Sequence, residues 1–222
     1  MRITLPSGTE AEFERPAERP TMGLVIAPDI GGLRPLFDAM VGRMCSVWNM
    51  STVAVEPFPG HDLGDDLDSR MAAVATLSDA EHLRDLEEAA EATGCDTVGL
   101  IGFCMGGMYC FKSAVSDNFA RIASFYGMIR LPDNWKGAGH REPLDALAAG
   151  HDERVMAIIG DLDPYTPPAD VAALESTSVT VVRYPDADHG FAHDAERPAH
   201  RSDDAADAFA RAEQWLLGAV GA

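Results

Sequence analysis

Short runs of β-branched and apolar residues alternate along this chain with longer segments of helical periodicity. Such alternation is typical of an α/β fold, in which a mostly parallel central sheet is flanked by helices on both faces. The expected strands are residues 24–27, 52–55, 98–101, 122–125, 155–159 and 179–184. The expected helices are residues 35–48, 79–93, 106–116, 168–174 and 202–220.

The chain has the length of one domain. With 222 residues it can bury roughly 70% of the surface that its unfolded form would expose. Neither an internal repeat nor an interdomain linker interrupts the alternation, so we expect residues 1–222 to form a single domain. The longest irregular stretch, residues 130–154, is rich in glycine, proline and charge. Because long loops are often functional, we expect this stretch to act as a partial lid.

Charge and cysteine content restrict the partners of the chain. Its formal net charge of −19 repels the phosphates of nucleic acid and an anionic membrane surface. No run approaches the ~18 apolar residues of a membrane-spanning helix, and residues 1–11 lack the apolar core of a targeting segment. The four cysteines lie in or beside apolar runs, which favours reduced thiols. We expect a cytoplasmic protein, monomeric or a small homo-oligomer, that binds neither nucleic acid nor membrane.

Residues 98–107 carry the strongest chemical signal. They read Val-Gly-Leu-Ile-Gly-Phe-Cys-Met-Gly-Gly, a strand followed by a sharp turn and the start of a helix. This is the nucleophile-elbow pattern with Cys104 in the place where serine usually stands, flanked by Gly102 and Gly106 where a Cβ would collide with a neighbouring element. The turn points Cys104 at a helix N-terminus, whose positive end favours thiolate. We therefore predict a nucleophile. The alternatives are a buried structural cysteine and a nucleotide-binding turn, which needs a different glycine spacing.

A thiol nucleophile in acyl transfer needs a base, and in this fold an acid and then a histidine follow the nucleophile along the chain. His189 follows the last expected strand and precedes a glycine, so it is the predicted base. The acid is expected in the loop 160–167, where spacing alone leaves Asp161 and Asp163 open. His193 lies four residues after His189, but no third ligand accompanies the pair in the sequence, and we predict neither a metal nor a cofactor.

The other five histidines lie in polar surroundings. We expect them to be solvated surface groups: His61, His82, His140, His151 and His200.

Four segments together resemble the dienelactone hydrolase family, whose members are α/β-hydrolases. They are Gly-Phe-Cys104-Met-Gly-Gly, Gly-x-x-Asp163-x-x-x-Pro, His189-Gly-Phe-Ala and the early turn Ala27-Pro-Asp-Ile30-Gly. The similarity runs from about residue 22 to the C-terminus, and its elbow is specific because most α/β-hydrolases carry serine there. The resemblance implies an α/β-hydrolase fold and Asp163 as the acid, since the family's acid stands four residues before the proline. It also implies an oxyanion hole formed by the backbone amides of Ile30 and Met105, which elbow geometry would supply independently.

The expected substrate-binding residues are Asp29, Arg34, Tyr126, Trp135, Phe191 and His193. Asp29 stands where the resemblance implies a glutamate beside the thiol, with a turn or capping aspartate as the alternative. His193 stands where the family has an arginine that holds the carboxylate of the lactone substrate. Carboxylate recognition is therefore expected to be weaker or to move to another cation, for which Arg34 is the candidate. The three aromatic residues could form an apolar wall.

The combined prediction is hydrolysis of a small ester or lactone through an acyl-thiol intermediate. His189 would take the proton of Cys104, Asp163 would orient His189, and two amides would hold the oxyanion. Neutral short-chain substrates are expected to be preferred over the carboxylated dienelactone. The alternatives are a thioesterase or haloacid-type hydrolase on the same scaffold and, outside catalysis, a redox-sensing thiol protein.

Overall fold

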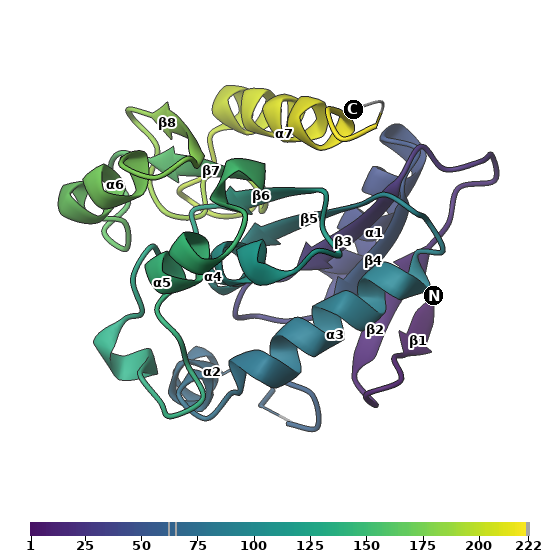
Figure 1. Cartoon of the computed structure of the whole chain (residues 1–222), viewed down its shortest axis with the longest axis horizontal. Helices are drawn as coiled ribbons and strands as arrows, with labels where there is room; N and C mark the ends of the chain where they lie inside the picture. The colour runs from purple at the N-terminus through teal and green to yellow at the C-terminus, as the bar shows by residue number, and fades with distance from the viewer. Residues whose placement is uncertain (62, 65, 221–222) are drawn as a thin grey trace.

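An eight-stranded sheet forms the centre of the computed structural model, which describes residues 1–61, 63–64 and 66–220 (Figure 1). The strand order is β1-β2-β4-β3-β5-β6-β7-β8. The strands are β1 (Arg2–Thr4), β2 (Glu10–Glu14), β3 (Gly23–Ala27), β4 (Ser51–Val55), β5 (Val98–Phe103), β6 (Arg121–Phe125), β7 (Val155–Gly160) and β8 (Thr180–Tyr184). β1 and β2 are antiparallel to their neighbours, whereas β4, β3, β5, β6, β7 and β8 run parallel. This mostly parallel sheet confirms the predicted fold class.

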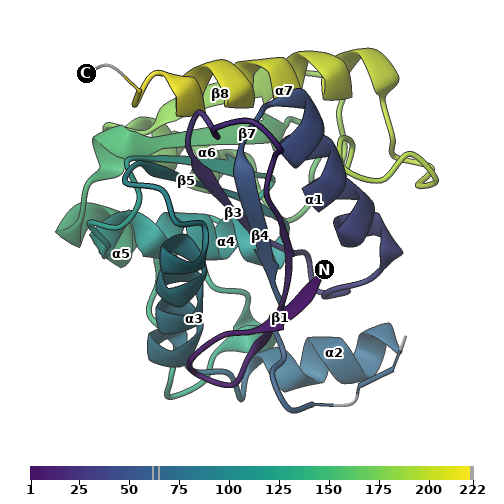
Figure 2. The same ribbon diagram turned by 90° about the vertical axis from the view of Figure 1, so that its right-hand side faces the viewer.

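Helices cover both faces of the sheet (Figure 2). The helices are α1 (Pro35–Val47), α2 (Leu67–Val74), α3 (Asp79–Ala92), α4 (Met105–Lys112), α5 (Pro143–Ala149), α6 (Pro168–Glu175) and α7 (Ser202–Leu217). The buried side chains of α1 and α7 join one hydrophobic cluster, and those of α3, α4, α5 and α6 join the other. Every residue of β3, β4, β5 and β7 is buried, as expected for parallel strands covered on both sides.

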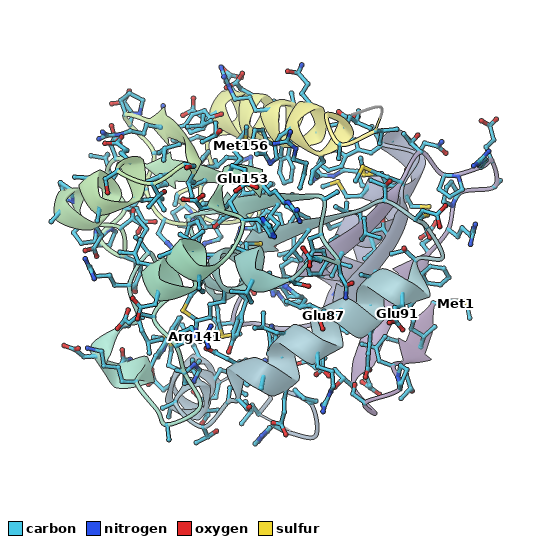
Figure 3. All side chains as sticks on the ribbon, viewed as in Figure 1. Met1, Glu87, Glu91, Arg141, Glu153 and Met156 are labelled. Carbon is cyan, nitrogen blue, oxygen red and sulfur yellow. The ribbon has the colours of Figure 1, made fainter. Side chains whose placement is uncertain are left out.

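The helices follow the expected amphipathic pattern. In α3 the apolar residues Leu86, Ala89 and Ala90 are buried, whereas Glu91 is exposed on the outside of the helix (Figure 3). Ser78 caps the start of α3 by accepting a hydrogen bond from the Glu81 backbone amide. Among the residues described, no helix is both long and apolar enough to cross a membrane.

Two helices were not predicted from the sequence. α2 has eight residues, of which only Val74 is buried, so its periodic signal is weak. α5 lies inside residues 130–154, which were expected to be irregular, and two 3-10 turns, Asp133–Trp135 and Asp152–Arg154, flank it there. With seven residues, α5 spans about two turns, too few for a clear 3.6-residue period.

Two of the histidines expected at the surface are buried. His82 is 4% exposed, and the side chain of His140 is fully covered. Both lie near a buried ion pair in which Lys112 Nζ contacts Asp79 Oδ1 at 2.7 Å, and His140 Nδ1 lies 3.1 Å from the same oxygen. Asp79, Lys112 and His140 therefore form an internal polar cluster.

Candidate active site

The three predicted catalytic residues follow the carboxyl ends of parallel strands. Cys104 comes directly after β5, Asp163 lies in the loop after β7, and His189 lies in the loop after β8. Parallel strands present these ends at one edge of the sheet, so three segments distant in sequence converge there. Cys104 and His189 line the same cavity, and His189 Nδ1 lies 2.8 Å from Asp163 Oδ2.

The elbow holds Cys104 in a strained backbone conformation, with φ 54° and ψ −114°. A Cβ on Gly102 would lie 2.3 Å from the Gly106 carbonyl oxygen, and one on Gly106 would lie 2.0 Å from the Ala27 carbonyl oxygen. No side chain fits at either position, which is the steric reason anticipated for both glycines. α4 begins at Met105, so Cys104 occupies the helix N-cap position.

Hydrogen bonds prepare His189 to carry a proton. Burial by itself would lower its pKa, but the hydrogen bonds with Asp163 and Cys104 outweigh burial and raise the pKa to about 10. The raised pKa favours imidazolium at neutral pH, which is the partner that a cysteine thiolate needs. The ring is also held edge-to-face by Tyr165, at 4.8 Å between ring centroids, and by Tyr126, at 5.3 Å.

The structure distinguishes the two candidate acids. Asp163 is buried, and its second oxygen, Oδ1, accepts a hydrogen bond of 2.8 Å from the Tyr165 backbone amide. Both of its oxygens are therefore oriented. Asp161 instead forms an ion pair with Arg183 at 2.8 Å, and both side chains of this pair are partly exposed. Only Asp163 contacts His189.

Two backbone amides are available near the thiol. The hydrogen bonds of the described residues leave the Ile30 amide unused, and Ile30 lines the cavity beside Cys104. Met105 is the first residue of α4, where helix geometry gives the N–H no intrahelical acceptor. Both predicted oxyanion donors are therefore in elements that adjoin Cys104.

The cavity that contains the thiol has a volume of about 410 Å³, within the range of small-molecule sites. Most of its wall is apolar and is formed by Ile30, Leu67, Met71, Met128, Pro132 and Trp135. The polar part of the wall comes from Cys104, Asn134, Tyr165, His189 and Arg197. Residues 1–61, 63–64 and 66–220 contain no group of three or more His, Cys, Asp or Glu side chains that could hold a metal ion.

The sequence comparison decides the family. Residues 57–219 match the sequence model of the dienelactone hydrolase family. The chain belongs to the dienelactone hydrolase family. The matched residues include the elbow, the acid loop and the histidine loop that carry the resemblance, whereas the early turn at residues 27–31 precedes them.

Two named proteins are similar in sequence to this dienelactone hydrolase family member. A putative carboxymethylenebutenolidase from Synechocystis sp. is 30% identical over 161 residues, which cover 70% of this chain and 64% of that protein. A probable 2-oxo-3-(5-oxofuran-2-ylidene)propanoate lactonase from Bradyrhizobium sp. is 29% identical over 99 residues, which cover 42% of this chain and 39% of that protein. The chain thus matches less than two thirds of the length of either relative.

Solved structures share the fold. A putative dienelactone hydrolase from Klebsiella pneumoniae has a TM-score of 0.82 at 21% identity, with 97% of each chain covered. A dienelactone hydrolase-like promiscuous phosphotriesterase from metagenomic libraries has a TM-score of 0.71 at 19% identity, covering 100% of this chain and 98% of that chain. Both likenesses show an α/β-hydrolase fold for this family member.

The structure divides the predicted substrate-binding residues into two groups. Trp135 lines the cavity, as does the neighbouring Pro132, so part of the expected lid segment 130–154 forms the cavity wall. The other five do not line it: Asp29, Arg34, Tyr126, Phe191 and His193.

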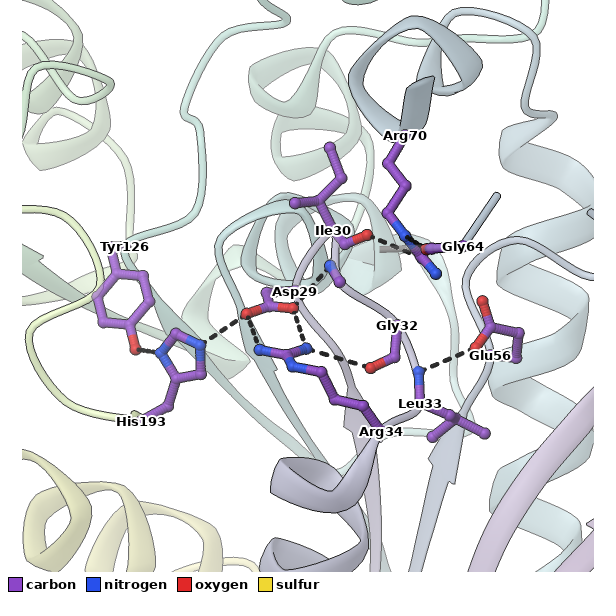
Figure 4. A network of polar contacts seen from close by, with 11 residues as sticks. Asp29, Ile30, Gly32, Leu33, Arg34, Glu56, Gly64, Arg70, Tyr126 and His193 are labelled. Atoms are coloured by element: carbon purple, nitrogen blue, oxygen red, sulfur yellow. Dashed lines mark hydrogen bonds and ion pairs between the residues drawn. The ribbon is translucent and has the colours of Figure 1, made fainter. Parts of the chain in front are cut away.

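These five residues are occupied with each other or with the core. Arg34 was the candidate cation, but its two terminal nitrogens lie 2.6 and 2.9 Å from the two Asp29 carboxylate oxygens. His193 donates to Asp29 and contacts the Tyr126 hydroxyl (Figure 4). Phe191 is fully buried against Tyr126. In this structure their contacts are with one another or with the core, and direct substrate binding by these five residues stays a prediction.

Arg197 is the cavity residue that sequence reasoning missed. It is exposed, lines the cavity with Cys104 and His189, and has no carboxylate within ion-pair distance in the described part of the chain. Gly190, with φ 76°, leaves room for the Arg197 guanidinium, because a Cβ at residue 190 would lie 2.9 Å from Arg197 Cζ. Its polar sequence context resembles any surface loop, so no local signal identifies it.

Proposed function

We propose that this dienelactone hydrolase family member hydrolyses small carboxylic esters or lactones through an acyl-thiol intermediate on Cys104. One observation carries the proposal. The strained elbow presents Cys104 to the cavity that also contains His189, and His189 is held by Asp163 at 2.8 Å. A nucleophile, a base and an orienting acid in this order form the arrangement used for acyl transfer.

Acylation begins once Cys104 has transferred its proton to His189. The thiolate sulfur bonds to the carbonyl carbon of the substrate, and the carbonyl π electrons move to oxygen. The Ile30 and Met105 amides donate hydrogen bonds to this oxyanion, and such donors are typically worth ~10²–10³ in rate each. When the tetrahedral intermediate collapses, the bond to the leaving alkoxide breaks, and His189 gives the alkoxide its proton.

Deacylation uses the same groups in reverse. His189 removes a proton from water, whose oxygen attacks the thioester carbon, and the same amides hold the second oxyanion. The carbon–sulfur bond then breaks, which releases the carboxylic acid and restores the thiolate. Asp163 accepts the Nδ1 hydrogen of His189 throughout, which keeps Nε2 directed at the reacting atoms.

The cavity supports a small and mainly apolar substrate. Its volume of about 410 Å³ and its wall, which includes Met71, Met128 and Trp135, suit a short acyl group or a lactone ring. Arg197 supplies the cationic contact for an anionic substituent, in place of the Arg34 contact that the ion pair with Asp29 removes. Cytoplasmic location, a monomeric or small oligomeric state, and the absence of nucleic-acid and membrane partners stay proposals from composition.

A redox-sensing role receives less support than hydrolysis. The four cysteines are free thiols, and Cys110, the candidate resolving residue, is fully buried with Sγ 3.6 Å from the Ala123 carbonyl oxygen. Burial raises the pKa of Cys110 well above its usual range, so it lacks the thiolate character that disulfide exchange requires. Nothing in the cavity favours thioesters or halogenated acids over oxygen esters.

Mass spectrometry tests the proposal. Wild-type protein quenched in acid during turnover of p-nitrophenyl acetate should carry one acetyl group, located on the peptide that contains Cys104. Prior alkylation of Cys104 with iodoacetamide should prevent both acetylation and turnover. Turnover without an acyl adduct, or an adduct on another residue in the wild type, would reject Cys104 as the nucleophile.

A further inference from the structure

A chain of polar contacts that the proposed mechanism does not use joins Tyr126, His193, Asp29 and Arg34 (Figure 4). The Tyr126 hydroxyl contacts His193 Nδ1, His193 Nε2 lies 2.8 Å from Asp29 Oδ2, and Asp29 binds Arg34 through both oxygens. Tyr126, His193 and Asp29 are 0%, 6% and 5% exposed. His193 and Asp29 thus form a second histidine–carboxylate pair, separate from His189 and Asp163.

The direction of each hydrogen bond in this chain can be assigned. Burial by itself would raise the pKa of Asp29, but the hydrogen bonds from His193 and Arg34 keep it below its usual range, so Asp29 is an ionised acceptor. His193 Nε2 therefore carries the hydrogen. Burial lowers the pKa of His193, which leaves Nδ1 unprotonated and able to accept the Tyr126 hydroxyl hydrogen.

Asp29 is the centre of the turn that carries the Ile30 amide. Its Oδ1 accepts a hydrogen bond of 2.8 Å from the Gly31 amide, and its carbonyl oxygen accepts one of 3.0 Å from the Gly32 amide. With Arg34 and His193 also bound, all acceptor positions of the carboxylate are directed at the turn or at His193. Asp29 is therefore not free to act on the thiol.

The opposite side of the same turn is held by two other residues. Arg70 of α2 donates a hydrogen bond of 3.2 Å to the Ile30 carbonyl oxygen, and Glu56 accepts one of 2.9 Å from the Leu33 amide (Figure 4). Fixed on both sides, the peptide can hold the Ile30 N–H toward the cavity before substrate arrives. Oxyanion donors are effective when they are oriented in advance.

The loop after β8, which carries both His189 and His193, connects the catalytic base to the turn that carries the Ile30 amide. His193 lies four residues after His189, and the Tyr126 ring contacts both imidazoles, with centroid distances of 5.6 and 5.3 Å. Tyr126 has φ 40°, an unfavourable conformation for a residue with a side chain, which persists only where the surroundings impose it. One loop thus supplies the base and reaches the oxyanion turn.

We propose that His193, oriented by Tyr126, is a positioning residue that fixes the Ile30 oxyanion donor through Asp29. This inference rests on the proposed acyl-transfer function. It assigns the His193–Asp29 pair to stabilisation of the tetrahedral intermediate and leaves formation of the thiolate to His189.

Substitution of His193 by phenylalanine tests the inference. The phenyl ring can fill the space that the imidazole occupies between Phe37 and Phe103, whose rings stack on His193. The N–H donor to Asp29 is lost. We expect kcat for p-nitrophenyl acetate to fall about 10- to 100-fold while KM changes less than threefold, because the oxyanion contact is made only in the transition state. Iodoacetamide alkylation of Cys104 forms no oxyanion, so its rate should change less than twofold.

Two further variants keep the test decisive if His193→Phe folds poorly. His193→Gln retains an N–H donor and should recover part of the lost kcat. Tyr126→Phe leaves the Asp29 contact and should lower kcat less than His193→Phe. His61→Phe, at an exposed histidine, is the control and should leave both rates unchanged.

An unchanged kcat in folded His193→Phe would overturn the inference. A parallel loss of turnover and alkylation would also overturn it, because His193 would then act on the thiol–imidazole pair. Failure of wild-type protein to form an acyl adduct is a different result, since it rejects the proposed function itself.

Discussion

His189 Nδ1 donates a hydrogen bond of 2.8 Å to Asp163 Oδ2, across 26 residues of sequence. Both residues are buried, at 8% and 4% exposure. The contact orients the imidazole so that its other nitrogen is available to Cys104. It also raises the pKa of His189, together with the hydrogen bond that His189 donates to Cys104. Ring orientation and charge are therefore set by the same interactions.

Replacement of Cys104 by alanine should abolish ester hydrolysis, with at least a ~10³-fold loss in kcat, because the described residues that line the cavity include no second thiol and no serine or threonine hydroxyl. The fold should persist, since Cys104 is only partly buried. Thermal unfolding monitored by circular dichroism provides the control for folding. Residual activity above a few per cent of wild type would move the nucleophile elsewhere.

Replacement of Asp163 by asparagine should lower kcat by up to ~10⁴-fold, because a neutral amide can stabilise the wrong tautomer of His189. Asp161→Asn is the matched control. Asp161 pairs with Arg183 at a partly exposed position, so its loss should change kcat less than about twofold. Steady-state kinetics on one ester suffices, and equal losses in the two variants would contradict the assignment.

Stability should decline as pH rises above neutrality. The pKa of His189 is about 10 in the folded protein and 6.5 in the unfolded chain, so the folded state binds more protons between these values. The contribution is fully present below about pH 6.5 and is lost as pH rises toward 10. Urea unfolding at several pH values should show a decreasing free energy of unfolding. The decrease should be smaller in His189→Gln, and an equal decrease there would assign it to other groups.

Removal of the Arg197 guanidinium should change substrate preference. For an ester with a carboxylate near the scissile bond, Arg197→Met should lower kcat/KM about tenfold or more, equivalent to about 1.4 kcal/mol. For the neutral analogue the change should stay below about twofold. A comparison of the two kcat/KM ratios is independent of active-enzyme concentration. Equal effects on both substrates would show that Arg197 does not recognise charge.

The sequence alone was sufficient to predict those features in which local geometry restricts the residue type. The order of strands and helices follows from periodicity and was predicted for all six central parallel strands. The elbow is recognisable because only glycine fits at 102 and 106, where a Cβ would lie within 2.3 Å of backbone atoms. His189 was predicted from its place after the last strand. Spacing alone left Asp161 and Asp163 open, and only the family resemblance favoured Asp163.

Tertiary structure decided the contacts between residues far apart in the chain. His193 and Asp29 are separated by 164 residues, and His193 and Tyr126 by 67. No local sequence pattern shows that these side chains form hydrogen bonds with one another in the protein interior. The position of Arg197 at the cavity also depends on tertiary packing, because its guanidinium lies where a Cβ on residue 190 would come within 2.9 Å of Cζ. Periodicity and backbone sterics act over a few residues, whereas pairing of buried polar groups depends on how distant segments pack.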